Sequence, residues 1–210
     1  CLVVFGLAII WGLALDGAKE YGRLLRDSGY NVDYGAKYGS GAAILNFGVY
    51  GLFIVLYYLL IGAKWNAATL GCVFCMVCCC YKGSHPANVW PIMVGYVAAS
   101  YIAEFVCGLT GAEHTLMANA QAIVIGLCFA NGLSPVTGVY GWLAGVLFGM
   151  IHYTFVTCVP LLHGAFCLYN GGFTAAFVCL MLIPILERFT KTKSQLQAER
   201  AALQAEKTAE

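Results

Sequence analysis

The sequence predicts an all-α, polytopic integral membrane protein with about seven apolar segments. Apolar residues make up 61% of the 210 residues and only 10% are charged, whereas roughly 25% of the residues in an ordinary soluble domain are charged. The mean hydropathy is +0.79. The apolar residues are also gathered in runs. A water-soluble chain of this length could not cover so much apolar surface.

The composition excludes two classes of protein. Disordered chains are poor in aromatic residues and rich in charge, but 14% of this chain is aromatic. Lys and Arg number 11 against 10 Asp and Glu, which gives a net charge of +1 without a basic stripe. We therefore expect no nucleic-acid partner. The partner that the composition indicates is the lipid bilayer.

Seven apolar runs are candidates for membrane helices, because a helix that crosses the bilayer needs about 20 apolar residues. They are expected at residues 2–15, 41–61, 67–81, 89–107, 116–130, 139–162 and 172–186. The third and fifth runs are short, and turn residues follow each of them, at 83–86 and 131–135. Since non-helical backbone at membrane depth needs protein or a water-filled cavity around it, one or two segments are expected to be re-entrant or broken. The alternative is two short helices in a tilted bundle.

The sequence divides into two parts near residue 190. Residues 1–189 are expected to form the transmembrane domain, with a polar loop at residues 17–40. Residues 190–210 are rich in Ala, Glu, Gln and Lys, which predicts a charged helical tail in water. The sequence begins at Cys1, inside an apolar run and without Met, so we expect an upstream part to be missing.

The distribution of Lys and Arg predicts the orientation. If all seven segments cross the bilayer, ten of the 11 Lys and Arg residues lie on one side, and only Lys64 lies on the other. Cytoplasmic loops carry an excess of these residues. We therefore predict a multi-pass protein of the cell membrane with residues 17–40 and the C-terminal tail in the cytoplasm.

The turn before the last segment is the strongest candidate for a binding site. Two glycines follow Asn170, and they allow the backbone to reverse without strain. The reversal brings His163, Tyr169 and Asn170 near a helix start, whose N–H groups suit a carboxylate, a carbonyl or an anion. The alternative is an ordinary helix start capped by Asn170. We predict that the turn faces inward, towards His85 and Ser134, and lines a polar pocket.

Residues 85–92 predict the start of another helix. Asn88 is expected to be its N-cap, and Pro91 fits a first helical turn. Trp90 suits the aromatic belt at the membrane interface. By itself this stretch implies no chemistry.

Polar side chains within apolar segments are costly and are functional candidates by default. His152 lies in the middle of the sixth segment. A neutral histidine bonded to a neighbouring helix is the favoured interpretation, because neutral imidazole is the cheaper form in a low dielectric. Asn46 lies in the second segment, where its amide can bond across helices. Glu104 is expected at the level of the lipid headgroups.

Five cysteines resemble a metal site at first sight: Cys72, Cys75, Cys78, Cys79 and Cys80. Their spacing is helical and their neighbours are apolar, whereas iron–sulfur and zinc ligands sit in loops that wrap the metal. We interpret them as packing residues and expect no metal and no cofactor. No phosphate-binding loop or hydrolase motif is present, so no catalytic residue is assigned.

Glycines at positions 138, 141, 145 and 149 place small residues along one stripe of the sixth segment. Such a stripe allows helices to approach closely. It would serve either packing within the chain or contacts in a homo-oligomer.

Four blocks of the sequence are similar to an uncharacterised bacterial family of multi-span membrane proteins that contain a duplicated domain of unknown function. The blocks are DYGAKYGSGAAILNFGVYG, SHPANVWPIMVGY, GLSPVTGVYGWLAGVLFGMIH and HGAFCLYNGGFTAAFV, within residues 30–188. Members of that family are usually longer, with two related halves, and this chain resembles the C-terminal half. The resemblance implies an integral membrane protein and supplies no activity.

The leading hypothesis is a transporter or channel-like protein for a small polar, uncharged solute, because no Lys or Arg lies within an apolar segment to bind a strong anion. The residues expected to bind the solute are Asn46, His85, Asn88, Ser134, His152, His163, Tyr169 and Asn170. Two alternatives stay open. One is a membrane-embedded enzyme that uses His152 or His163, and the other is a non-catalytic partner subunit whose tail docks another protein.

Overall fold

The regular elements of the chain are all helical in the computed structural model, which describes residues 1–162, 164 and 170–209. No strand occurs among those residues, so the predicted all-α fold class is confirmed. The elements are α1 (Leu2–Ala14), α2 (Ala18–Leu24), α3 (Tyr34–Leu60), α4 (Ala67–Cys78), η1 (Cys79–Tyr81), α5 (Pro86–Thr110), α6 (Gln121–Ala130), η2 (Asn131–Leu133), α7 (Ser134–Tyr140), α8 (Trp142–Leu162), α9 (Asn170–Phe189) and α10 (Lys193–Ala209).

Five stretches of helix in the described part of the chain are long and apolar enough to cross a membrane. They are α3, α5, α6 with α7, α8, and α9 with the helix that follows it. The number rises to six if α1 and α2, which are bent by 110° at their junction, are counted as one span. The apolar helix at Ala67–Tyr81 is shorter. The chain is thus a membrane protein of several helices, and the predicted number of seven spans is not confirmed.

The expected polar loop at residues 17–40 contains helices. α2 occupies Ala18–Leu24, and α3 begins at Tyr34 because the Asp33 side chain accepts a hydrogen bond from the Ala36 N–H (3.0 Å) and caps the helix. Gly39 interrupts α3 with φ 84° and ψ 159°, a conformation open to glycine. The prediction of a loop was wrong for residues 18–24 and 34–40, because capping and a single glycine break allow a polar stretch to be helical, whereas residues 25–33 join the two helices without regular structure.

The turn expected at residues 131–135 is also helical. α6 continues through η2 into α7, and Gln121–Tyr140 forms one span of 20 residues. Asn131 has helical backbone angles, φ −52° and ψ −31°. Pro135 lies in the first turn of α7, where a missing N–H costs nothing. The true break comes at Gly141, whose φ of 108° and ψ of 173° separate α7 from α8.

Several contacts show which termini of the helices share an end of the bundle. Lys82, after η1, forms an ion pair with Asp33 at the start of α3 (2.7 Å). Lys193 packs against Gly141 at the start of α8. At the opposite end, the Asn66 amide donates to Gln121 Oε1 (2.7 Å). We call the end that carries Asp33, Lys82 and Gly141 the basic end, because Lys and Arg are concentrated there.

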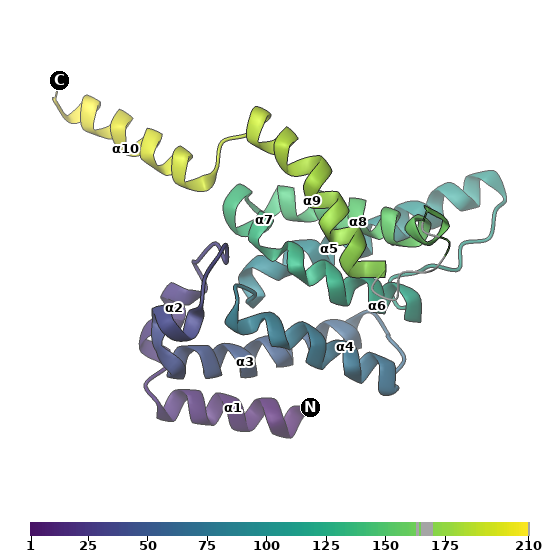
Figure 1. The fold of residues 1–210 in the computed structure, drawn as a ribbon, viewed down its shortest axis with the longest axis horizontal. Coiled ribbons are helices and arrows are strands. Elements are labelled where there is room, and N and C mark those ends of the chain that lie inside the picture. Colours follow the sequence, from purple (N-terminus) through teal and green to yellow (C-terminus); the bar gives the residue numbers. More distant parts are fainter. Residues whose placement is uncertain (163, 165–169, 210) are drawn as a thin grey trace.

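The helices pack in two groups, and Figure 1 shows α1, α3 and α4 side by side below α5 to α9, with α10 reaching away from the bundle. One apolar core joins the groups and contains large buried side chains, among them Tyr50, Tyr58, Tyr96 and Phe148. Close approach depends on glycine. A Cβ added to Gly149 of α8 would lie 2.4 Å from the Ile92 oxygen of α5. Gly145 and Gly149 therefore pack against α5 within the chain, whereas Gly138 lies in α7 against Ser28 and Gly141 breaks the expected helix.

Candidate functional site

A buried turn between η1 and α5 gathers four of the residues that the sequence singled out. The turn comprises residues 82–85, and Ser84 and His85 are buried. The Gly83 oxygen accepts hydrogen bonds from Tyr34 Oη (2.9 Å) and from the Asn88 amide (2.7 Å). The turn is thus held by side chains of α3 and α5. We call the set Asn46, Tyr50, Ser84, His85, Asn88, Asn131 and Ser134 the turn cluster.

Asn46 projects from α3 and is fully buried. Its amide nitrogen donates to the oxygens of Cys80 and Ser84, each at 3.0 Å. Cys80 lies in η1, where the helix that began with α4 ends, and Ser84 lies in the turn before α5, so neither carbonyl is in the middle of a regular helix. Leaving one of them buried and unpaired would cost about 1–3 kcal/mol. The Asn46 Oδ1 atom is itself buried without a hydrogen-bond partner.

Asn131 and Ser134 approach the turn from η2 and α7. The Asn131 amide donates to the Met76 oxygen (3.1 Å), and Asn131 Oδ1 accepts from the Tyr50 hydroxyl. The hydroxyls of Ser134 and Ser84 lie 3.0 Å apart. Sequence reasoning missed Asn131 and Tyr50. The Asn–Gly pair was interpreted as a turn, and a tyrosine in an apolar segment gives no signal of its own.

His85, and not Asn88, is the N-cap of α5, because Pro86 starts the helix three residues earlier than expected. Asn88 instead accepts from the His85 N–H through Oδ1 (2.9 Å). His85 Nε2 lies 3.1 Å from the backbone carbonyl oxygen of Asp27. Since a carbonyl only accepts, Nε2 carries the proton. Burial lowers the pKa of His85, so the ring is neutral, and its buried Nδ1 has no hydrogen-bond partner.

A second polar cluster, which we call the His152 cluster, is formed by Tyr96, His152, Asn170 and Gly171. His152 is fully buried. Its Nε2 donates to the Gly171 oxygen (3.0 Å), and its Nδ1 accepts from the Tyr96 hydroxyl. The favoured interpretation of a satisfied neutral histidine thus agrees with the geometry. Both ring nitrogens of His152 therefore have hydrogen-bond partners within the bundle.

The predicted binding turn is only partly described. His163 and Tyr169 lie outside the described residues. Asn170 is the first residue of α9, and its amide donates to the Val156 oxygen of α8 (3.0 Å). Asn170 therefore belongs with His152. Asn46, His85, Asn88 and Ser134 meet instead in the turn cluster.

The cysteines occupy different surfaces of α4 and η1. Cys72 and Cys80 are buried, whereas Cys75 and Cys78 are exposed. Within the described residues, no group of three or more His, Cys, Asp or Glu side chains is placed to hold a metal ion. The thiol of Cys128 approaches the Cys72 oxygen (3.8 Å) and joins α6 to α4.

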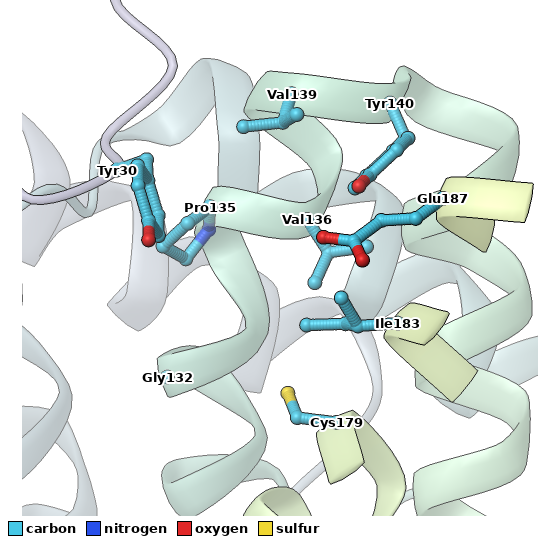
Figure 2. A pocket seen from close by; sticks show the side chains of 9 residues that line it. All are labelled: Tyr30, Gly132, Pro135, Val136, Val139, Tyr140, Cys179, Ile183 and Glu187. Carbon is cyan, nitrogen blue, oxygen red and sulfur yellow. The ribbon is translucent and has the colours of Figure 1, made fainter. Parts of the chain in front are cut away.

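A cavity of about 440 Å³ lies between α7 and α9, and Figure 2 shows the side chains that line it. We call it the α7–α9 groove. Its lining consists of Tyr30, Gly132, Pro135, Val136, Val139, Tyr140, Cys179, Ile183 and Glu187. The groove has apolar walls and two phenols and one carboxylate among its lining groups. Sequence reasoning could not find this groove, because its residues come from three separate segments.

Comparison with known families adds one finding. Residues 15–188 match a family described as "Protein of unknown function (DUF1576)". The chain belongs to this family. The match covers the helices from α2 to α9 except for the last residue of α9, so it includes the turn cluster, the His152 cluster and the α7–α9 groove. No curated protein and no solved structure matches the chain.

Proposed function

We propose that this membrane protein is a transporter or channel-like protein and that the turn cluster handles a small polar, uncharged solute. One observation carries the proposal. The Asn46 Oδ1 acceptor is buried without a partner, and the nitrogen of the same amide bonds the backbone oxygen of Ser84, whose hydroxyl lies 3.0 Å from that of Ser134. An unsatisfied buried acceptor is costly, and a solute that donates a hydrogen bond would remove that cost.

The chemistry of the buried side chains favours an uncharged solute. The buried polar residues in the described part of the chain are Asn, Ser, Thr and His. The nearby Asp27 side chain is only 4% exposed, but its carboxylate is already paired with Lys37 and Tyr38. The neutral His85 adds a ring-nitrogen acceptor, Nδ1, to this set. A charged solute would lose its hydration without meeting an opposite charge. A neutral solute can exchange its hydrogen bonds with water for bonds to amides and hydroxyls.

The route that we propose passes between the 82–85 turn and α7. These two elements meet through the Ser84–Ser134 contact of 3.0 Å. Irregular or short helical segments on both sides supply backbone groups that can bind a solute, as in transporters with interrupted helices. The solute would replace the serine–serine bond, so passage requires no buried charge to move.

The test is flux through the purified chain in proteoliposomes. The solutes are urea, glycerol and a monosaccharide, with acetate and methylammonium as charged counterparts. Ser134→Ala removes one hydroxyl and leaves the Asn46 bonds to the backbone in place. We expect it to reduce the flux of a neutral solute several-fold, as the loss of a hydrogen bond worth about 1 kcal/mol implies.

A matched control is Ser100→Ala. Ser100 is equally buried, but its hydroxyl bonds to the Val97 oxygen in its own helix (2.9 Å). Its flux should equal that of the unchanged chain. Equal flux in the Ser134→Ala protein, or a preference for either charged solute, would refute the proposal.

The orientation is a separate part of the proposal. The basic end carries Lys82 beside Asp33 and Lys193 beside Gly141, and an excess of Lys and Arg marks cytoplasmic ends. We propose that this end faces the cytoplasm and that the membrane is the cell membrane. A bacterial origin and a duplicated parent protein come from the sequence resemblance and stay within the proposal. A homo-oligomer would need a face other than the one that carries Gly145 and Gly149, which α5 already covers.

A further inference from the structure

We infer that the α7–α9 groove binds an aminophospholipid, with the lipid ammonium at Glu187 and one acyl chain along the groove. The inference does not depend on the proposed transport. It rests on how polar and apolar groups are distributed along the groove. Most of the lining is apolar, and a carboxylate and two phenols lie at one end.

The depth of the groove suits an acyl chain. Val136 and Ile183 face each other across it, and Cys179 lies below them (Figure 2). The neighbouring surface of α9 is apolar as well, because Leu180 and Met181 are exposed. A hydrocarbon chain can therefore pass from the bilayer into the groove without crossing polar groups. The volume of about 440 Å³ lies within the range of ligand cavities.

The end of the groove suits an ammonium group. Figure 2 shows the Glu187 carboxylate turned into the groove beside Tyr140, with Tyr30 on the far wall. A primary ammonium has three N–H donors, and these residues supply three acceptor groups. A hydrogen bond from an ammonium to a carboxylate is stronger than one between neutral groups. Tyrosine rings also attract cations through their faces.

The position of this end fits a lipid headgroup. Tyr140 and Glu187 lie near the ends of their helices, and tyrosine is enriched where spanning helices reach the headgroups. Lys193 packs against Gly141, one residue after Tyr140. In a zwitterionic headgroup, the phosphate could thus pair with Lys193 while the ammonium pairs with Glu187.

The experiment measures retained lipid. The whole chain is equilibrated in mixed micelles that contain equal amounts of phosphatidylethanolamine, phosphatidylcholine and phosphatidylglycerol with identical acyl chains. Native mass spectrometry then counts the lipids that stay bound. We expect phosphatidylethanolamine to be retained preferentially. Glu187→Gln should reduce that retention about tenfold, as loss of a charge-assisted bond implies. Glu104→Gln, at an exposed glutamate of α5, is the control and should change nothing.

A second pair of variants tests the groove itself. A Cβ on Gly132 would meet open space, so Gly132→Leu should fold and should fill part of the groove. It should lower retention of the lipid. Gly108→Leu adds the same side chain at another open position, on α5, and should leave retention unchanged.

Three outcomes would overturn the inference. Equal retention of phosphatidylcholine and phosphatidylethanolamine would remove the role of the primary ammonium. Undiminished retention in the Gly132→Leu protein would place the lipid elsewhere. Binding of phosphoethanolamine, which has no acyl chains, with the affinity of the whole lipid would identify a soluble amine as the ligand.

Discussion

Asparagine side chains bind backbone oxygens at several turns and helix segments of this protein. The amide groups of Asn46, Asn88, Asn131 and Asn170 each donate to at least one backbone oxygen. Lipid cannot satisfy a carbonyl that has lost its helical partner. An amide that reaches such a carbonyl therefore stabilises an irregular backbone at low cost. Asn46, Asn88 and Asn131 also belong to the turn cluster, which we propose handles the solute.

The Tyr96–His152 pair gives a prediction for a double-mutant cycle. Replacing His152 by Leu leaves the buried Tyr96 hydroxyl and the Gly171 oxygen without their partner. We expect the free energy of unfolding to fall by about 2–4 kcal/mol. Tyr96→Phe should cost less. The double variant should be less destabilised than the sum of the two, which unfolding in detergent can measure. An additive result would show that the two side chains do not interact.

Asp27 gives a prediction about pH. Partial burial raises the pKa of its carboxyl. Hydrogen bonds from Lys37 and Tyr38 (2.6 Å each) and from the Gly29 N–H lower the pKa, and together they outweigh the effect of burial. The pKa of Asp27 therefore lies below its usual value. Its contribution to stability is therefore complete above the unfolded pKa of about 3.9 and is lost as pH falls through the folded pKa.

We expect Asp27→Asn to lower the unfolding free energy by about 1 kcal/mol at pH 7. The difference from the unchanged chain should shrink as the pH is taken below about 4. Thermal unfolding between pH 3 and pH 7 checks this. Asp16→Asn, at an exposed ion pair with Lys19, is the control and should have little effect. A difference that stays constant over the whole pH range would contradict the assignment.

Several pairs of helices pack closely through glycine. Gly48 and Gly51 of α3 lie against Phe5 of α1, and Gly95 and Gly149 join α5 to α8. Any side chain at these positions would meet backbone atoms or a buried ring. Gly149, one of the four glycines that the sequence offered for either internal packing or oligomer contact, is thus used to bring neighbouring helices together.

Gly149→Ala tests the contact between α5 and α8. The new methyl group would lie 2.4 Å from the Ile92 oxygen, so the helices must separate. We expect a loss of about 1–3 kcal/mol of unfolding free energy. Gly108→Ala lies on α5 facing open space and should be neutral or stabilising, because alanine favours helix. Equal stability of the two variants would rule out close packing at Gly149.

The whole molecule has two unlike ends, and their assignment is testable. Single cysteines at Lys19 and Ser194, in a background without other accessible thiols, should react with a membrane-impermeant maleimide only after the membrane is opened. A cysteine at Lys64 should react from outside. These results follow if the basic end is cytoplasmic. Labelling of either basic-end cysteine in intact cells would reverse the topology.

The sequence by itself determined the fold class, the membrane environment and most apolar helices, because hydrophobic runs of helical length have few other stable arrangements. It also identified Asn46, His85, Asn88 and Ser134 as polar residues worth explaining, since polar groups in such runs are rare. It misjudged residues 17–40 and 131–135. Local turn propensities there were overridden by caps and by bonds to distant residues.

Only the tertiary structure decided which polar residues meet. Asn46 and Ser134 are far apart in the chain, and both reach the 82–85 turn because α3 and α7 pack around it. His152 and Asn170 belong to another cluster, which spacing along the sequence does not reveal. The α7–α9 groove also depends on assembly, because its walls are apolar residues that look like ordinary core. Periodicity specifies which face of a helix is apolar, whereas side-chain shape and the pairing of helices determine where a cavity or a polar cluster forms.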